Sequence, residues 1–253
     1  KHTKSVLRGV IKGIDKKSKI LIWAGGIWDW FDPLTAIKGV SELSQSDPDI
    51  KLVFLGTTHP NKLVGKMSMT EQAINLAEKL GAKNKSVFFI EGWTDYNDRV
   101  NYLLEADAAV SLHQNNLETR LSFRTRILDH FWAELPSVVT TGDWFAELIG
   151  HENLGEVIDY SDVEGFKAAV GYVLKHSSEI KQNTRREREG FKWSTIVGGN
   201  LKEYIESHQD NDSALPENFI NYYIDIASMG MLKSDSAELQ KKKNTLDHLN
   251  ERN

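Results

Sequence analysis

The residues best suited to chemistry are concentrated between Glu118 and Asp129. This segment reads Glu-Thr-Arg-Leu-Ser-Phe-Arg-Thr-Arg-Ile-Leu-Asp, so that three arginines lie between two acids. A helix predicted to begin at Ser122 would present unpaired backbone N–H groups beside these arginines, which favours anion binding. Carboxylates on either side suit the hydroxyl groups of a sugar or a ribose. The segment therefore indicates a site for a phosphorylated sugar, most simply a nucleotide sugar.

Within this segment, Ser122 is the predicted N-cap, and Phe123 belongs to the apolar face of the helix. Cations in a first helical turn oppose the helix dipole at a cost of roughly 0.3–1 kcal/mol, which a bound anion would offset. The alternative is a salt-bridge network among the charged residues of the segment. The residues expected to hold the anion are Arg120, Ser122, Phe123, Arg124, Thr125 and Arg126.

Three other loops also offer polar and aromatic side chains. The glycine pair after the first predicted strand could hold a ligand or serve only a tight turn. The aromatic residues around Asp29 would pack mainly in the core, which leaves the acid as the ligand contact. A loop histidine could contact phosphate or be structural, and two further aromatics could stack on a nucleobase or pack at a helix start. These candidates are Gly25, Gly26, Asp29, His59, Trp93 and Tyr96.

Apolar strands that alternate with helices must position these loops. Such a pattern predicts an α/β fold, a doubly wound parallel sheet of about six strands with extra C-terminal helices. Ligands bind such sheets outside the carboxyl ends of the strands, where all four loops fall. We expect strands at 19–26, 50–56, 87–90, 108–113, 137–140 and 155–158. We expect helices at 33–44, 69–80, 97–105, 122–134, 163–175, 178–190 and 194–207.

Composition excludes several classes of function. A net charge of −5 argues against nucleic acid as a partner. The absence of cysteine excludes disulfides and Cys-based zinc sites. The histidines lack metal-ligand spacing, so we expect no metal site. No apolar run approaches the ~20 residues that span a bilayer, and no signal peptide is visible.

The 253 residues divide into three predicted segments. Residues 1–18 are expected to be an interdomain crossover segment. Residues 19–207 form the nucleotide-sugar-binding, Rossmann-like domain. Residues 208–253 are a linker and a helical or disordered tail.

Several strings resemble the C-terminal, donor-binding half of a family-4 glycosyltransferase with the GT-B fold. The likeness covers roughly residues 1–207. It implies that Glu118 contacts the donor's sugar hydroxyls as the catalytic acid and that Asp129 contacts the ribose. The strings that carry it lie at 23–35, 54–60, 88–93, 102–113, 118–136 and 191–193.

The chain departs from the family pattern in three places. Ten residues separate Glu118 from Asp129, where the family has Glu, seven residues and Glu. The family's Arg and Lys that hold the pyrophosphate are missing from residues 26–35, so one of the three arginines is expected to replace them. Glu134 stands where the family usually has glycine.

The resemblance implies a hexosyltransferase-type enzyme of polysaccharide biosynthesis. It would transfer sugar from a nucleotide diphosphate sugar to a glycan or lipid-linked acceptor, with retention and without metal or cofactor. An N-terminal acceptor domain would precede Lys1, so we expect this chain alone to be inactive. The full-length protein would be cytoplasmic or associate peripherally with the inner face of the membrane. The alternatives are a non-catalytic nucleotide-sugar-binding or assembly module and a sugar-nucleotide epimerase.

Overall fold

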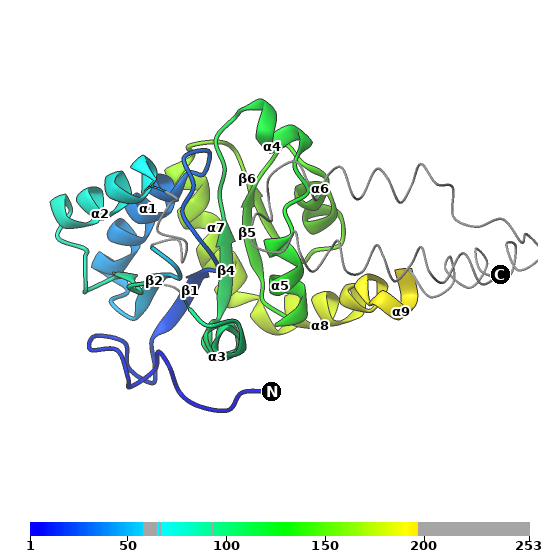
Figure 1. Cartoon of the computed structure of the whole chain (residues 1–253), viewed down its shortest axis with the longest axis horizontal. Helices are drawn as coiled ribbons and strands as arrows, with labels where there is room; N and C mark the ends of the chain where they lie inside the picture. The colour runs from blue at the N-terminus through cyan, green and yellow to red at the C-terminus, as the bar shows by residue number, and fades with distance from the viewer. Residues whose placement is uncertain (58–64, 66, 93, 197–253) are drawn as a thin grey trace, which may run out of the picture. The chain divides into compact units, whose positions relative to one another are not determined.

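A computed structural model describes residues 1–57, 65, 67–92 and 94–196 (Figure 1). His59 and Trp93 lie outside the described residues, and so does the segment 208–253. The described part forms one compact unit that includes the N-terminal segment.

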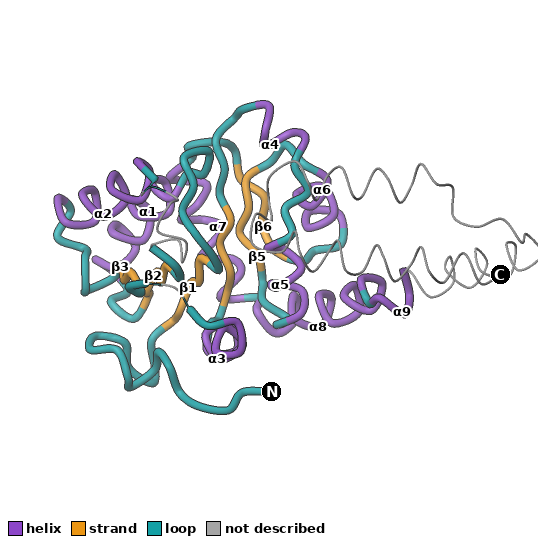
Figure 2. The backbone as a smooth tube through the Cα atoms, viewed as in Figure 1, coloured by secondary structure: helices purple, strands orange, loops and turns teal. Residues whose placement is uncertain are grey.

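Six parallel strands form a single sheet in the order β3-β2-β1-β4-β5-β6 (Figure 2). The predicted doubly wound sheet is therefore confirmed. The order reverses between β1 and β4, where Leu21 pairs with Ala108, and such a switch point opens a crevice at the carboxyl ends of the strands. The strands are β1 (Lys19–Trp23), β2 (Ile50–Phe54), β3 (Val87–Phe89), β4 (Ala108–Ser111), β5 (Ser137–Thr140) and β6 (Gly155–Ile158).

Helices cover both faces of this sheet. One face packs against α1 (Pro33–Ser46), α2 (Ser68–Lys79) and α7 (Val163–Lys175). The other face packs against α3 (Tyr96–Glu105), α5 (Arg126–Trp132) and α6 (Trp144–His151). The remaining helices are α4 (Leu117–Leu121), α8 (Ser177–Glu187), the 3₁₀ helix η1 (Arg188–Phe191) and α9 (Trp193–Ile196).

The strands are apolar along their length because both of their faces are buried. On β1, Leu21 and Trp23 belong to the core under α1, α2 and α7, whereas Ile20 and Ile22 belong to the core under α3. This two-residue alternation is the strand period, and it explains why an uninterrupted apolar run was the signal for this strand.

The helix expected at 122–134 is wrong at its start. Asn116 accepts a hydrogen bond from the Thr119 backbone N–H at 2.9 Å and thereby caps a separate short helix, α4. Ser122 is the C-cap of α4, and α5 begins only at Arg126. Phe123 is consequently 57% exposed and does not belong to the buried face. Helices α4 and α6 were not predicted; they begin at the N-caps Asn116 and Asp143, whose side chains accept from the backbone N–H groups of Thr119 and Ala146.

Glu134 shows why its position usually carries glycine. Its φ angle is 57°, in the left-handed region that glycine adopts most easily. Arg185 and Arg188 both form ion pairs with its carboxylate, at 2.6 and 2.7 Å, and hold it between α5 and α8.

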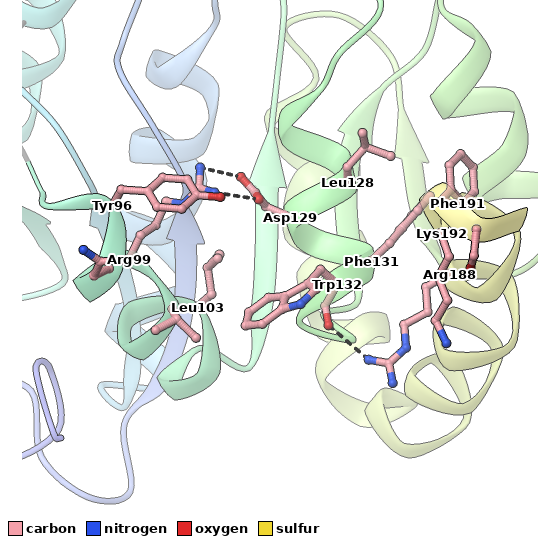
Figure 3. Close-up of a pocket in the computed structure, with 13 residues that line it drawn as sticks. Tyr96, Arg99, Leu103, Leu128, Asp129, Phe131, Trp132, Arg188, Phe191 and Lys192 are labelled. Carbon is pink, nitrogen blue, oxygen red and sulfur yellow. Dashed lines mark hydrogen bonds and ion pairs between the residues drawn. The ribbon is translucent and has the colours of Figure 1, made fainter. Parts of the chain in front are cut away.

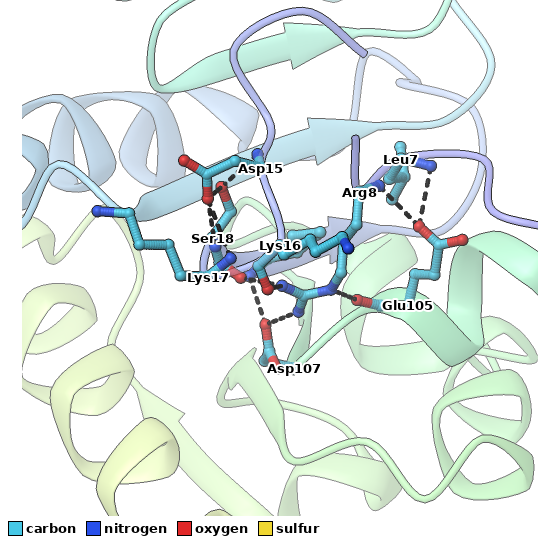
Figure 4. A network of polar contacts seen from close by, with 9 residues as sticks. Leu7, Arg8, Asp15, Lys16, Lys17, Ser18, Glu105 and Asp107 are labelled. Carbon is cyan, nitrogen blue, oxygen red and sulfur yellow. Dashed lines mark hydrogen bonds and ion pairs between the residues drawn. The ribbon is translucent and has the colours of Figure 1, made fainter. Parts of the chain in front are cut away.

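The N-terminal segment is fastened to the end of α3 by one carboxylate (Figure 4). Glu105 accepts backbone hydrogen bonds from Val6, Leu7 and Arg8 at 2.8–2.9 Å. The Arg8 guanidinium in turn pairs with Asp107 at 2.6 Å. Val6 and Leu7 are buried beside α3, so this segment is part of the domain's core.

We predict that Glu105→Gln lowers the free energy of unfolding by about 1–3 kcal/mol, because an amide NH₂ replaces an acceptor that faces backbone donors. Burial alone would raise the pKa of Glu105, but the hydrogen bonds from Arg8, His2, Val6 and Leu7 outweigh it and lower the pKa from 4.5. The ionised carboxylate therefore stabilises the fold fully above pH 4.5, the ordinary pKa of a glutamate in the unfolded chain. This stabilisation is lost as the pH falls through the lowered pKa of the folded state. Urea denaturation between pH 3 and 7 measures it. Exposed Glu179→Gln is the control, and equal stability of both variants at pH 7 would contradict the prediction.

Candidate functional site

The loops that follow β1 and β4 are joined at the switch point. Phe31 and His113 form an isolated antiparallel bridge, and the Gln114 side chain donates hydrogen bonds to the carbonyls of Asp29 and Phe31 at 3.2 and 3.1 Å. The polar residues of the two loops are thereby fixed relative to each other at the edge where ligands bind.

Arg126 extends from α5 to the glycine turn after β1. Its Nη2 donates to the Gly26 carbonyl at 3.4 Å, and a Cβ on Gly25 would lie 3.6 Å from the same nitrogen. The φ of Gly25 is 137°, which disfavours any side chain there. The glycine pair thus serves a turn and also lets the cation approach the backbone.

The charge of Arg126 is not neutralised within the described part of the chain. Its Nη1 is buried and has no hydrogen-bond partner, and its guanidinium lies 4.2 Å from the centre of the Phe31 ring. Burial, together with the charge of Arg124, lowers its pKa to about 10, so it remains protonated at neutral pH. A partly buried cation with a buried, unpartnered nitrogen favours an anionic ligand.

Glu118 lies in the first turn of α4 and faces His113. Glu118 Oε2 is 3.9 Å from His113 Nδ1, and both atoms are buried without a hydrogen-bond partner. Burial, with the charges of Arg124 and Arg126, lowers the pKa of His113 to about 2, so the imidazole is neutral. The pair can therefore offer an acidic oxygen and a neutral ring nitrogen to a polar ligand.

Asp129 lies on α5 and pairs with Arg99 on α3. Their atoms Nη1 and Oδ2 are 2.9 Å apart, and the Tyr96 ring lies 4.9 Å from the same guanidinium. The pair is at the wall of a cavity of about 910 Å³ between α3, α5 and η1 (Figure 3). Tyr96 is 75% exposed and can contact a ligand there.

Arg124 does not stand in a first helical turn, contrary to expectation. It precedes α5, is buried, and forms an ion pair with Asp143, the N-cap of α6. It also donates to the Thr140 carbonyl at 3.3 Å. The alternative, a salt-bridge network within the segment, is wrong for two of its members, because Arg124 pairs with Asp143 and Asp129 pairs with Arg99.

The other predicted contacts have more local surroundings. Asp29 accepts from the Met69 backbone N–H at 2.8 Å and holds the start of α2. Arg120 is exposed and donates to Asn115 at 3.2 Å. Thr125 is exposed and caps nothing with its side chain. The site-residue assignments as a whole remain predictions.

Sequence reasoning missed three residues that the structure brings to this edge: Arg99, His113 and Asp143. Asp143 directly precedes an apolar run, which is an N-cap signal that could have identified the last of them, and its side chain accepts from the Ala146 backbone N–H. Nothing in the sequence pairs Arg99 with a residue 30 positions away.

Among the described residues, no group of three metal-ligating side chains occurs. No helix there is long and apolar enough to cross a membrane.

The sequence matches the model of a known protein family. The family model for glycosyl transferases group 1 matches residues 10–193. No curated protein matches the chain.

Solved structures share the fold. A glycosyltransferase from Rickettsia africae ESF-5 has a TM-score of 0.63 at 14% identity, over 78% of this chain and 50% of that one. HepE of Anabaena, in complex with UDP and glucose, gives 0.58 at 13%, over 76% and 49%. WaaG, a glycosyltransferase involved in lipopolysaccharide biosynthesis, gives 0.53 at 21%, over 70% and 44%. The chain thus spans about half the length of these proteins.

We predict that Arg124→Ala lowers the free energy of unfolding by about 3–5 kcal/mol, because it leaves the buried carboxylate of Asp143 without its cation. Arg120→Ala, an exposed arginine of the same segment, should change it by less than about 0.5 kcal/mol. Urea denaturation at pH 7 compares the two. A loss below about 1 kcal/mol for Arg124→Ala would mean that the ion pair does not hold this loop.

Proposed function

Because this chain belongs to the glycosyl transferases group 1 family, we propose that it is the donor-binding part of an enzyme that transfers sugar from a nucleotide diphosphate sugar. The observation that carries the proposal is the unneutralised guanidinium of Arg126 beside the Gly25–Gly26 turn. It lies at the carboxyl edge of β1, where doubly wound sheets bind phosphorylated ligands.

Arg126 is our choice among the three arginines for the pyrophosphate. Arg124 forms an ion pair with Asp143, and Arg120 is exposed and donates a hydrogen bond to Asn115. Only Arg126 combines a buried, unbonded nitrogen with contact to the glycine turn. In transfer, the oxygen of an acceptor hydroxyl bonds to the sugar's anomeric carbon as the bond from that carbon to the phosphate oxygen breaks. The hydroxyl proton passes to the leaving nucleoside diphosphate, and a fixed cation stabilises the negative charge that develops on its phosphates.

The two acids bind the remaining parts of the donor in this proposal. Glu118, with a buried oxygen free of partners, accepts from the sugar hydroxyls, and Asp129 accepts from the ribose. Transfer proceeds with retention, and Arg126 supplies the cationic charge that a metal would otherwise provide. The acceptor is a glycan or lipid-linked sugar, in the cytoplasm or at the inner face of the membrane.

A non-catalytic nucleotide-sugar-binding module is the second candidate. The ten-residue spacing between Glu118 and Asp129 favours it, because the structure fills that spacing with an extra helix and a buried ion pair. Both candidates bind the donor, and only transfer distinguishes them.

We predict that the chain binds a nucleoside diphosphate from the panel UDP, GDP and ADP, with or without EDTA. Arg126→Ala should weaken binding roughly tenfold or more, because a charge-assisted hydrogen bond to phosphate is lost. Arg120→Ala should leave it within about twofold. Titration calorimetry measures both, and binding by none of the three nucleotides in folded protein would refute the proposed function.

We predict that this chain alone transfers no sugar to an acceptor. Transfer requires two substrates held together away from water, and the proposed second domain forms the opposite wall of that cleft. Radiolabelled UDP-, GDP- and ADP-sugars with glycan and lipid-linked acceptors provide the assay. Transfer by the chain alone would place the complete active site within these residues.

A further inference from the structure

Arg99 holds the carboxylate of Asp129 at two points. Its Nη1 is 2.9 Å from Oδ2, and its Nη2 donates to Oδ1 at 3.1 Å. The dashed lines in Figure 3 mark these contacts between α3 and α5. Such a planar fork fixes the plane of a carboxylate as well as its position.

The fork leaves part of the carboxylate available. Each carboxylate oxygen can accept about two hydrogen bonds, and Arg99 uses one on each. The side chain of Asp129 is 23% exposed at the cavity wall, so the remaining acceptor positions can meet a ligand. The remaining acceptor positions point outward from the two oxygens, so a ligand hydroxyl can donate to an oxygen of the fixed carboxylate from the cavity side.

The surroundings of Arg99 keep the fork in place. The ring of Tyr96 lies 4.9 Å from its guanidinium, one helical turn before it on α3. Two other cations line the same cavity, but Arg188 pairs with Glu134 and Lys192 pairs with Glu189. Among the described residues, Arg99 is therefore the cation that contacts Asp129 directly.

We propose that Arg99 is a positioning residue that sets the selectivity of this site for a ribose: it holds Asp129 so that its carboxylate accepts from a ribose hydroxyl of the bound nucleoside diphosphate. The inference rests on the proposed function. It assigns to a residue of α3, outside the Glu118–Asp129 segment, the task of discriminating ribose from deoxyribose.

Arg99 also favours the ionised form of Asp129. Burial raises the pKa of Asp129, and the charges of Arg99 and Arg126 oppose that shift. Arg188 and Lys192 across the cavity are neutralised by their own acids. Without Arg99, the carboxyl of Asp129 should take up a proton at higher pH and lose acceptor capacity.

The experiment compares a nucleoside diphosphate with its 2′,3′-dideoxy form. The nucleotide is the tightest binder among UDP, GDP and ADP, and calorimetry gives both dissociation constants. Wild-type protein should prefer the ribose form by roughly tenfold or more, because a hydrogen bond to a carboxylate is at stake. Arg99→Lys and Arg99→Ala should reduce that preference at least about threefold, and binding by Arg99→Ala should weaken at a higher pH than wild type as pH is lowered from 8 to 5.

The matched control is Arg188→Lys, which alters a cation of the same cavity that does not touch Asp129 and should keep the wild-type preference. Circular dichroism establishes that each variant is folded, and Arg99→Lys provides the test if Arg99→Ala unfolds. An unchanged ribose preference in Arg99→Lys would overturn this inference and leave the proposed function standing. Failure of wild-type protein to bind any of the three nucleotides would instead refute the proposed function.

Discussion

Two arginines lie close together at the switch point of the sheet, and only one of them has a carboxylate partner among the described residues. Arg124 is paired with Asp143, whereas the charge of Arg126 is opposed only at a distance, by Asp129 and Glu118. The two guanidinium groups also repel each other, and this repulsion contributes to the lowered pKa of Arg126. At this edge of the sheet, Arg124 therefore stabilises the fold, whereas Arg126 is left to bind a ligand.

The acids near this edge also differ in whether their carboxylates have partners within the protein. Asp143 caps α6 and neutralises Arg124, so one carboxylate ties the β5–α6 connection to the loop before α5. Asp29 holds the start of α2. Each of these acids contacts a protein donor or cation, whereas Glu118 has a buried oxygen without a hydrogen-bond partner, 3.9 Å from His113. Because unsatisfied buried polar atoms are costly, those of Glu118, His113 and Arg126 at the ligand edge of the sheet are consistent with a binding site there, although other described residues, such as Asn101 and His130, also carry such atoms.

Much of the fold could be predicted from sequence because the signals are local. The apolar runs at Lys19–Trp23 and Ile50–Phe54 are strands buried on both faces, and Asp32 before Pro33 begins α1 as expected. The site was harder to predict because it depends on pairings across the sheet. Ser122 carries a good capping side chain, but Asn116 starts a helix earlier, and the four residues 122–125 then separate α4 from α5. The Arg99–Asp129 pair joins two crossover helices and has no signature in either of them.

The neutrality of His113 explains how one edge can hold both a cation and an acid for a donor. A protonated imidazole beside Arg124 and Arg126 would add a third positive charge, which burial and both arginines oppose. The neutral imidazole instead packs edge-to-face with the Phe31 ring, with 4.6 Å between the ring centroids, and its Nδ1 faces Glu118. The second buried histidine, His130, has a pKa of about 3 for the same reason of burial, and its Nδ1 is hydrogen-bonded to Ser137. Neither imidazole changes its charge between pH 5 and 8, so the attraction of this edge for an anion comes from Arg126 across that range.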